Sequence, residues 1–500
     1  MNRIYKPLLA IALLFTFSCA EDYLDTVPTD AVSSESVFTT TNNAMIALNG
    51  IHRSLLLRYD SQGQAGEGAV MIMRDVMADD VVMTTTGNGW YVSICRWLNH
   101  ISENSGDVRF VWRFYYKIIG NANLIIDNID AAEGSQEEKD EIKGQALAYR
   151  AWAHFNLVQM FAERYDYAGG NTQLGVPIVL EPITEGAARN TVEEVYAQVH
   201  TDLDAAIALL DDISGRNAKS HLDVNVVSGI KARVLATQGK YAEAATFANT
   251  AREGYDLMSE ADLYAGFNNV ENGEWIWGSH QVDDQQTYFA SYFAYMSLNF
   301  SSTNIRGNPK AINSTLYDMI SDSDYRKGLW DPNASDPALR DPYIDEMTLS
   351  SFAKIDYMNR KFIAQGNASS VGDVPYMRAS EMYLLEAEAL ARSGSDAAAA
   401  DLLFEFMQAR DPEYTRSSNT GSALVEEIMI QRRIELWGEG FRFYDLKRLN
   451  LPLDRSGANH VESVINGKYT EDAGAWEWQW QIPRDELNAN ELMEQNPTTD

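Results

Sequence analysis

The chain has 500 residues, of which 45% are hydrophobic and 22% are charged, a composition typical of globular proteins and unlike that of collagen or of disordered chains. With 40 basic and 72 acidic residues the net charge is −32 at pH 7, which disfavours binding to nucleic-acid phosphates and to anionic membrane surfaces. Only two cysteines occur, Cys19 and Cys95, so a disulfide framework and a cysteine-rich zinc module are excluded.

The first residues have the pattern of an export signal. Two basic residues precede an apolar run that is too short to cross a bilayer, for which about 20 apolar residues are needed. Cys19 follows this run in the position that bacterial lipoproteins acylate, although Thr16 stands where an aliphatic residue is usual. We therefore predict a signal peptide over 1–18, lipidation of Cys19 and a lipid-anchored tether over 19–40. A plain secretory signal with a chance cysteine is the alternative.

Several later segments have apolar residues at helical spacing, in chain order 44–57, 108–129, 141–161, 192–210, 224–254 and 380–410. Thr191 and Glu194 have the spacing of a capping box at the start of one of them. In the last two segments alanines flank Gly239 and Gly394, which is the layout of a tetratricopeptide helical hairpin. An unrelated pair of alanine-rich helices is the alternative.

The intervals 59–107 and 254–377 are rich in Gly, Asn, Ser, Asp and aromatic residues. We predict that they are long loops with short strands that carry the ligand, because long loops in compact proteins are usually functional. Trp275 and Trp277, in the alternating EWIWG, predict a buried strand. The predicted fold is therefore mainly α, a tetratricopeptide-like scaffold of helical hairpins with aromatic-rich loop and short-strand insertions. It forms a single domain over 41–500, with scaffold segments at about 41–58, 108–165, 191–253 and 378–450.

Five segments in chain order resemble the SusD/RagB family of surface lipoproteins that serve glycan uptake in Bacteroidetes. They are Cys19 with the following YLD and Pro28, then GQALAYRAWAHFNLVQMF with GVPIVLEP, VPYMRASEMYLLEAEALARSG, IMIQRRIELWGEGFRFYDLKR and WQIPRDELNANELMEQNP. The resemblance covers nearly the whole chain after the signal peptide. It implies an outer-membrane lipoprotein that faces the cell exterior, binds oligosaccharides and has a SusC-like, TonB-dependent transporter as its partner.

The fourth of these segments is dense in charged residues that invite an active-site interpretation. We predict instead a buried ion network around the Gly438–Gly440 turn, because opposite charges at this density neutralise each other and leave no unpaired acid. Its members are Arg433, Glu435, Glu439, Arg442 and Asp445. The C-terminal segment is predicted to pack onto the scaffold.

Motifs for catalysis, nucleotide binding and metal binding are absent from the sequence. There is no HExxH, Walker or GxSxG pattern, and the seven histidines lack metal-ligand spacing. The doublets Asp79-Asp80 and Asp283-Asp284 are predicted to be solvated loop residues. We therefore predict no catalytic residue, no cofactor and no metal ion, although calcium binding by the acidic loop SDSDYRKGLWDPNASDP is left open.

Aromatic residues in polar loops are the best candidates for a ligand site. Trp90 and Tyr91 follow a Gly-Asn-Gly turn that contains Asn88, and Tyr288 and Tyr292 recur at helical spacing beside polar residues. A sugar has an apolar ring face that aromatic rings can cover and hydroxyl groups that polar side chains can bind. These five residues are the predicted ligand-binding candidates; the alternative is that the rings pack the loops onto the scaffold.

The predicted function is that of a non-catalytic, lipid-anchored protein of the outer membrane that binds oligosaccharides and delivers them to a SusC-like transporter. It contacts the membrane through the N-terminal lipid only and binds no nucleic acid. Two alternatives remain: a glycoside hydrolase, which needs only a suitable pair of carboxylates, and a tetratricopeptide-type adaptor that binds another protein.

Overall fold

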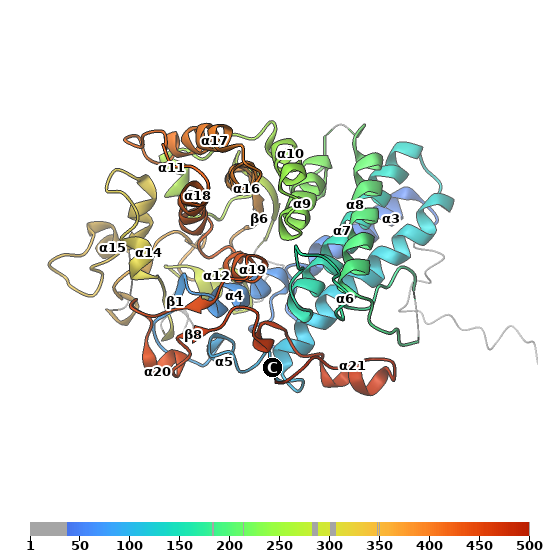
Figure 1. Cartoon of the computed structure of the whole chain (residues 1–500), viewed down its shortest axis with the longest axis horizontal. Coiled ribbons are helices and arrows are strands. Elements are labelled where there is room, and N and C mark those ends of the chain that lie inside the picture. The colour runs from blue at the N-terminus through green and yellow to red at the C-terminus, as the bar shows by residue number, and fades with distance from the viewer. Residues whose placement is uncertain are drawn as a thin grey trace, which may run out of the picture.

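The computed structural model of the chain describes residues 38–182, 185–213, 215–282, 289–300, 307–347, 349 and 351–499. Helices are the main regular structure of this part of the molecule. Figure 1 shows α6, α7 and α8 side by side at one end and α14 and α15 at the other. The predicted signal peptide, Cys19 and most of the predicted tether lie outside the described residues. None of the helices in the described ranges is both long enough and apolar enough to cross a membrane.

The long helices pack against one another in a series, α6 on α7, α7 on α8, α8 on α9, α9 on α10, α10 on α16, and α16 on both α17 and α18. Their bounds, with α3, are α3 (Thr41–Ser54), α6 (Gly106–Asn128), α7 (Gln136–Phe161), α8 (Val192–Leu210), α9 (Val224–Thr237), α10 (Tyr241–Arg252), α16 (Ala379–Arg392), α17 (Asp396–Gln408) and α18 (Ser422–Glu435). The shorter α-helices are α4 (Gly66–Met77), α5 (Val92–Cys95), α11 (Glu260–Leu263), α12 (Tyr292–Met296), α14 (Ser314–Tyr317), α15 (Pro342–Glu346), α19 (Arg442–Arg448), α20 (Glu462–Ile465) and α21 (Arg484–Ala489). Short 3-10 helices are η3 (Ile129–Ala131), η5 (Tyr325–Leu329), η6 (Ser351–Ala353) and η7 (Trp476–Trp478).

Local sequence signals set several helix boundaries. The Thr191 side chain accepts a hydrogen bond from the Glu194 amide and the Glu194 carboxylate accepts one from the Thr191 amide, so α8 begins where the capping box predicts. Gly239 and Gly394 have φ angles of 73° and 85°, a conformation that glycine adopts without strain, and they end the first helix of each predicted hairpin. The prediction of a mainly α fold is confirmed, and the two hairpins are consistent with a tetratricopeptide-like layout.

Helix α4 is the main departure from the predicted elements. The interval 59–107 was predicted to be a loop, but twelve of its residues form this helix and all twelve are buried. Its polar residues Glu67, Arg74 and Asp75 gather on one side of the helix, but that side faces buried partners instead of solvent, so the segment is covered on every side. The prediction of a loop was therefore wrong for this segment.

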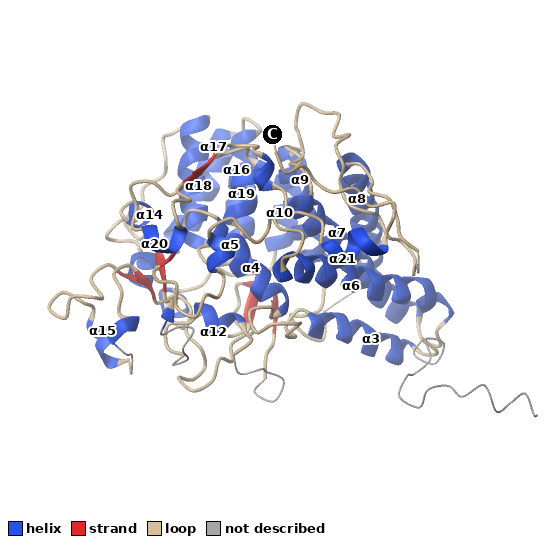
Figure 2. Cartoon of the chain, turned by 90° about the horizontal axis from the view of Figure 1, so that it is seen from below, coloured by secondary structure: helices blue, strands red, loops and turns tan. Residues whose placement is uncertain are grey.

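The strands are short, as Figure 2 shows, and they join distant parts of the chain. An antiparallel sheet has the order β1-β3-β5-β4, where β1 is Val81–Met83, β3 is Lys310–Ile312, β4 is Trp330–Asp331 and β5 is Met358–Asn359. Strand β2 (Trp275–Ser279) pairs antiparallel with β6 (Val374–Arg378), and β7 (Leu453–Asp454) with β8 (Thr470–Glu471). The predicted strand at Trp275 and Trp277 is confirmed, and it is buried throughout.

The C-terminal segment is hydrogen-bonded to the scaffold by main-chain and side-chain groups. The Trp480 amide donates to the Met160 carbonyl at 2.9 Å, and the Asn496 side chain donates to the Phe161 carbonyl at 2.6 Å. Both acceptors lie in the last turn of α7, where carbonyl groups lack partners within the helix. The prediction that this segment packs onto the scaffold is confirmed.

Candidate functional site

The charged motif predicted to be an ion network is buried in the centre of the protein. The Glu435 carboxylate accepts hydrogen bonds from Arg378 at 3.0 Å, from Arg410 at 3.0 Å and from Arg326 at 3.3 Å. Burial alone would raise the pKa of Glu435, but these three guanidinium groups hold it well below its usual range. We call the whole set the Glu435 network; it comprises Glu274, Asp324, Arg326, Lys361, Arg378, Arg410, Glu435 and Glu439.

The Glu435 network contains four acidic and four basic groups, so it is electrically balanced. Its carboxylates are occupied by guanidinium or ammonium groups, and none of its side chains is more than 5% exposed. A general acid needs a raised pKa and access to substrate, and Glu435 has neither. The interpretation of this motif as structural is therefore supported.

The Asp79-Asp80 doublet was predicted to be solvated, and this was wrong. Both residues are buried, and they lie in the short connection between α4 and β1. Arg442 donates to Asp79 at 2.7 and 2.9 Å, and Arg433 donates to Asp80 at 2.6 Å. The two arginines come from the same charged motif, more than 350 positions away, so the sequence around the doublet could not show that the two carboxylates are paired. The other doublet, Asp283-Asp284, lies outside the described residues.

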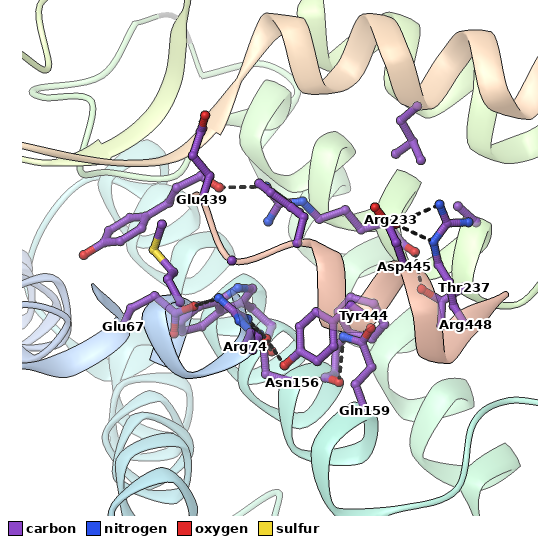
Figure 3. Close-up of a pocket in the computed structure, with 18 of the residues that line it drawn as sticks. Glu67, Arg74, Asn156, Gln159, Arg233, Thr237, Glu439, Tyr444, Asp445 and Arg448 are labelled. Carbon is purple, nitrogen blue, oxygen red and sulfur yellow. Dashed lines mark hydrogen bonds and ion pairs between the residues drawn. The ribbon is translucent and has the colours of Figure 1, made fainter. Parts of the chain in front are cut away.

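A polar cavity lies between α4, α7, α9 and α19 (Figure 3). Arg74 lies between Glu67 and Asn156, donating to Glu67 at 2.6 Å and to Asn156 at 3.1 Å, and the Tyr444 hydroxyl donates to the same Asn156 oxygen at 3.1 Å. Burial raises the pKa of Glu67 although Arg74 opposes the shift. The cavity has a volume of about 60 Å³, enough for about five water molecules. Sites for drug-sized ligands measure about 300–1,000 Å³, so a glycan chain does not fit here.

The loop 84–91, between β1 and α5, carries three of the predicted binding residues. Its base is fixed because the hydroxyl groups of Thr84 and Thr85 donate to the carbonyls of Pro309 and Gly307 in the loop before β3. Gly87 and Gly89 have φ angles of 45° and 86°, which let the chain turn sharply on both sides of Asn88. Asn88 is exposed at the tip of this turn.

The structure separates the two aromatic residues of this loop. Trp90 is half-buried, and its indole lies over Gly63 so closely that an added methyl group there would be 3.0 Å from the ring. Tyr91 is only 8% exposed, and its hydroxyl donates a hydrogen bond to the Gly63 carbonyl at 2.8 Å. Both rings contact Tyr295 edge-on, with centroid distances of 6.1 Å for Trp90 and 5.1 Å for Tyr91. Trp90 is thus held rigidly and retains accessible surface.

The remaining candidates do not join Trp90 at the surface. Tyr292 is 2% exposed; its hydroxyl donates to the Gly438 carbonyl at 2.5 Å and its ring packs edge-on against Phe362. Tyr288 lies outside the described residues. Gly63 and Tyr295, which support Trp90, were not among the predicted site residues. The helical spacing of Tyr292 and Tyr295 could have drawn attention to Tyr295. It did not show which of these two rings faces the loop 84–91.

A larger groove of about 810 Å³ lies along α6 and was not predicted. One wall is the stripe Trp112, Tyr116, Gly120 and Leu124, and the opposite wall is formed by Pro177, Val179, Glu181, Pro182, Glu185, Gly186 and Ala187. Residues four apart lie on one face of a helix, so the spacing of this stripe was available in the sequence. It was overlooked because the whole segment 108–165 was assigned to the scaffold.

The family models and the similar proteins that match this chain belong to SusD-like families. A family model described as "Starch-binding associating with outer membrane" matches residues 22–235, and a model described as "SusD family" matches residues 348–498. SusD-like protein P2 of Formosa agariphila is 25% identical over 535 residues, covering 99% of both chains.

No described group of three or more His, Cys, Asp and Glu side chains is arranged to hold a metal ion.

Solved structures agree with this family. A SusD-like carbohydrate binding protein from Bacteroides vulgatus is 28% identical and superimposes with a TM-score of 0.79, covering 91% of this chain and 98% of its own. A laminarin binding SusD-like protein is 20% identical with a TM-score of 0.70, covering 92% of this chain and 100% of its own. The second likeness is one of fold alone.

Proposed function

Since this chain belongs to the SusD/RagB-like family, we propose that it is a lipid-anchored, outer-membrane protein that binds oligosaccharides and delivers them unaltered to a SusC-like, TonB-dependent transporter. Cys19 is the proposed lipidation site. The tether from Cys19 confines the binding domain to a thin layer beside the transporter and so raises the local glycan concentration there. Weak binding by each protein molecule is then sufficient for uptake.

The observation that carries this proposal is the position of Trp90. An indole that is held on Gly63 and Tyr295 but keeps accessible surface is preorganised to cover the apolar face of a sugar ring. Asn88, exposed two residues before it, brings an amide to the same loop. The net charge of −32 favours neutral glycans over polyanionic ones.

The proposed absence of catalysis rests on the acids described above. The Glu435 network is charge-balanced, and Glu67, whose pKa is raised, lies on a cavity too small for a glycan. We therefore propose that the protein is not a glycoside hydrolase. Incubation of the purified protein with laminarin or starch is expected to release no reducing ends.

The test is the change Trp90→Ala, assayed by calorimetric titration with laminarin and soluble starch. We expect affinity for the bound glycan to fall at least about tenfold, because rigid aromatic anchors dominate binding energies. Trp90→Phe, which keeps an aromatic ring, should retain part of the affinity. Trp476→Ala is the matched control, since Trp476 is also half-buried but lies in η7. Wild-type affinity in Trp90→Ala would remove this loop from the binding site.

A further inference from the structure

The groove along α6 has the size and shape of a ligand site. Its volume of about 810 Å³ lies within the range of about 300–1,000 Å³ that ligand pockets occupy. Pro177 and Pro182 lie on the wall opposite the α6 stripe, and Glu486 of α21 and Asn490 just after it also line the groove. Tyr59 lines the groove as well.

The aromatic rings of the groove are fixed by polar contacts. The Tyr116 hydroxyl donates to the Pro177 carbonyl at 2.9 Å, and the Trp112 indole N–H donates to Glu486 at 3.3 Å. The two rings contact each other with a centroid distance of 4.8 Å. Because Tyr116 is only half-buried, part of its fixed ring is available to a ligand at little cost in conformational entropy.

The polar groups of the groove are suited to a neutral, hydroxylated ligand. The side chains of Asn121, Glu181 and Glu185 form no hydrogen bond or ion pair with any group in the described ranges, so their donors and acceptors are available. The lining contains two basic residues, Arg113 and Lys117, and three acidic ones, Glu181, Glu185 and Glu486. Since these charges nearly cancel, the groove does not select a strongly charged ligand. Hydroxyl groups can both donate to carboxylates and accept from the amide and the basic groups.

One short loop connects the groove with Trp90. In the loop 58–64, Tyr59 lines the groove whereas Gly63 lies under the Trp90 indole. The Tyr59 amide donates to the Gln64 carbonyl at 2.9 Å, which closes this loop on itself. Four residues of chain span at most about 14 Å, so this end of the groove lies close to the candidate site.

We propose that the groove along α6 is a second subsite for the same neutral oligosaccharide chain, which extends from Trp90 past Tyr59 to Tyr116 and Asn121. This inference rests on the proposed function. It adds that the protein prefers long glycan chains to short ones, since only a long chain occupies both subsites.

The test compares a polysaccharide with its own short fragments. The glycans are laminarin and soluble starch, each measured against its trisaccharide by calorimetric titration of the full mature chain. Gly120→Leu is the main variant: a Cβ at Gly120 meets nothing within 4 Å, so a leucine projects into the groove and favours the helix at the same time. Asn121→Ala removes the free amide. Gly120→Ala is the matched control, because it adds only a methyl group.

We expect Gly120→Leu and Asn121→Ala to weaken polysaccharide binding about fivefold each, the equivalent of one hydrogen bond, and to leave trisaccharide binding unchanged. Trp90→Ala should weaken both. Unchanged polysaccharide affinity in Gly120→Leu, or equal wild-type affinity for long and short chains, overturns the second subsite and leaves the proposed function standing. A wild-type protein that binds neither glycan overturns both. Unaltered glycan binding with loss of transporter association in Gly120→Leu would make the groove a protein contact instead.

Discussion

Removal of the Glu435 carboxylate would leave three buried guanidinium groups without their shared acceptor. We expect Glu435→Ala to lower the free energy of unfolding by about 3–5 kcal/mol, the range found when one partner of a buried ion pair is removed. Chemical denaturation followed by circular dichroism measures this. Asp401→Ala, which breaks an exposed pair with Arg416, is the control and should lower the stability far less, because solvent screens an exposed ion pair. Unchanged stability together with lost glycan binding would show that Glu435 belongs to the binding site.

Single residues could be assigned from the sequence only where the deciding contact is local. The Gly-Asn-Gly turn marks Asn88 and Trp90 as tip residues because the turn itself places them there. Tyr91 follows the same turn, yet its burial depends on Gly63, and that of Tyr292 depends on Gly438. Such partners are brought together by the fold, and no local pattern announces them. The same reason explains the wrong prediction for Asp79-Asp80.

The two glycine turns of the helical hairpins differ in their surroundings. Gly239 and Gly394 both have positive φ angles, so replacing either by alanine costs about 1–2 kcal/mol of backbone strain. A Cβ at Gly239 would also lie 3.1 Å from the Tyr167 ring, whereas one at Gly394 meets nothing within 4 Å. We therefore expect Gly239→Ala to lower the free energy of unfolding more than Gly394→Ala, measured by chemical denaturation. An equal or smaller loss at Gly239 would show that Tyr167 moves aside freely.

Helices that face both core and solvent were predictable, and a helix that faces only the core was not. The bounds of α8 follow from its capping box and its apolar stripe, and α9, α10, α16 and α17 follow from their glycine turns. Helix α4 has a polar face with Glu67 and Arg74, but this face is turned to buried partners, so the segment does not have the exposed polar side of a surface helix. The groove was missed for the opposite reason: its α6 stripe looks like an ordinary packing face until the opposite wall is known.

Across the whole molecule, histidines that the fold keeps neutral contribute to the loss of stability in acid, together with buried carboxylates such as Glu435 whose pKa is lowered. Burial lowers the pKa of six of the histidines, in every case with help from a nearby cation or histidine: His52, His100, His154, His200, His221 and His460. Below about pH 6.5 the unfolded chain takes up protons that the folded protein does not, so each of these residues lowers stability as the pH falls. Asp75 acts in the opposite direction, because burial raises its pKa to about 7 and protonation then favours the fold. The net pH dependence is a sum of opposing contributions, and single variants are needed to separate them.

His154 allows the clearest separation. Its Nδ1 lies 3.0 Å from the Arg150 carbonyl and its Nε2 accepts from the Val179 amide at 3.3 Å, so both ring nitrogens are used by the neutral form. Burial, with Arg150 adding to it, lowers its pKa to about 3, and the stability that depends on the neutral ring is therefore lost progressively between about pH 6.5 and pH 3. We expect His154→Gln to be less stable than the wild type at pH 8, where neither state titrates. The difference should shrink by about 1.4 kcal/mol for each pH unit below about 6, as measured by denaturation at a series of pH values. Parallel stability curves for the two proteins down to pH 4 would show that this ring is protonated in the folded state and that its site admits the charge.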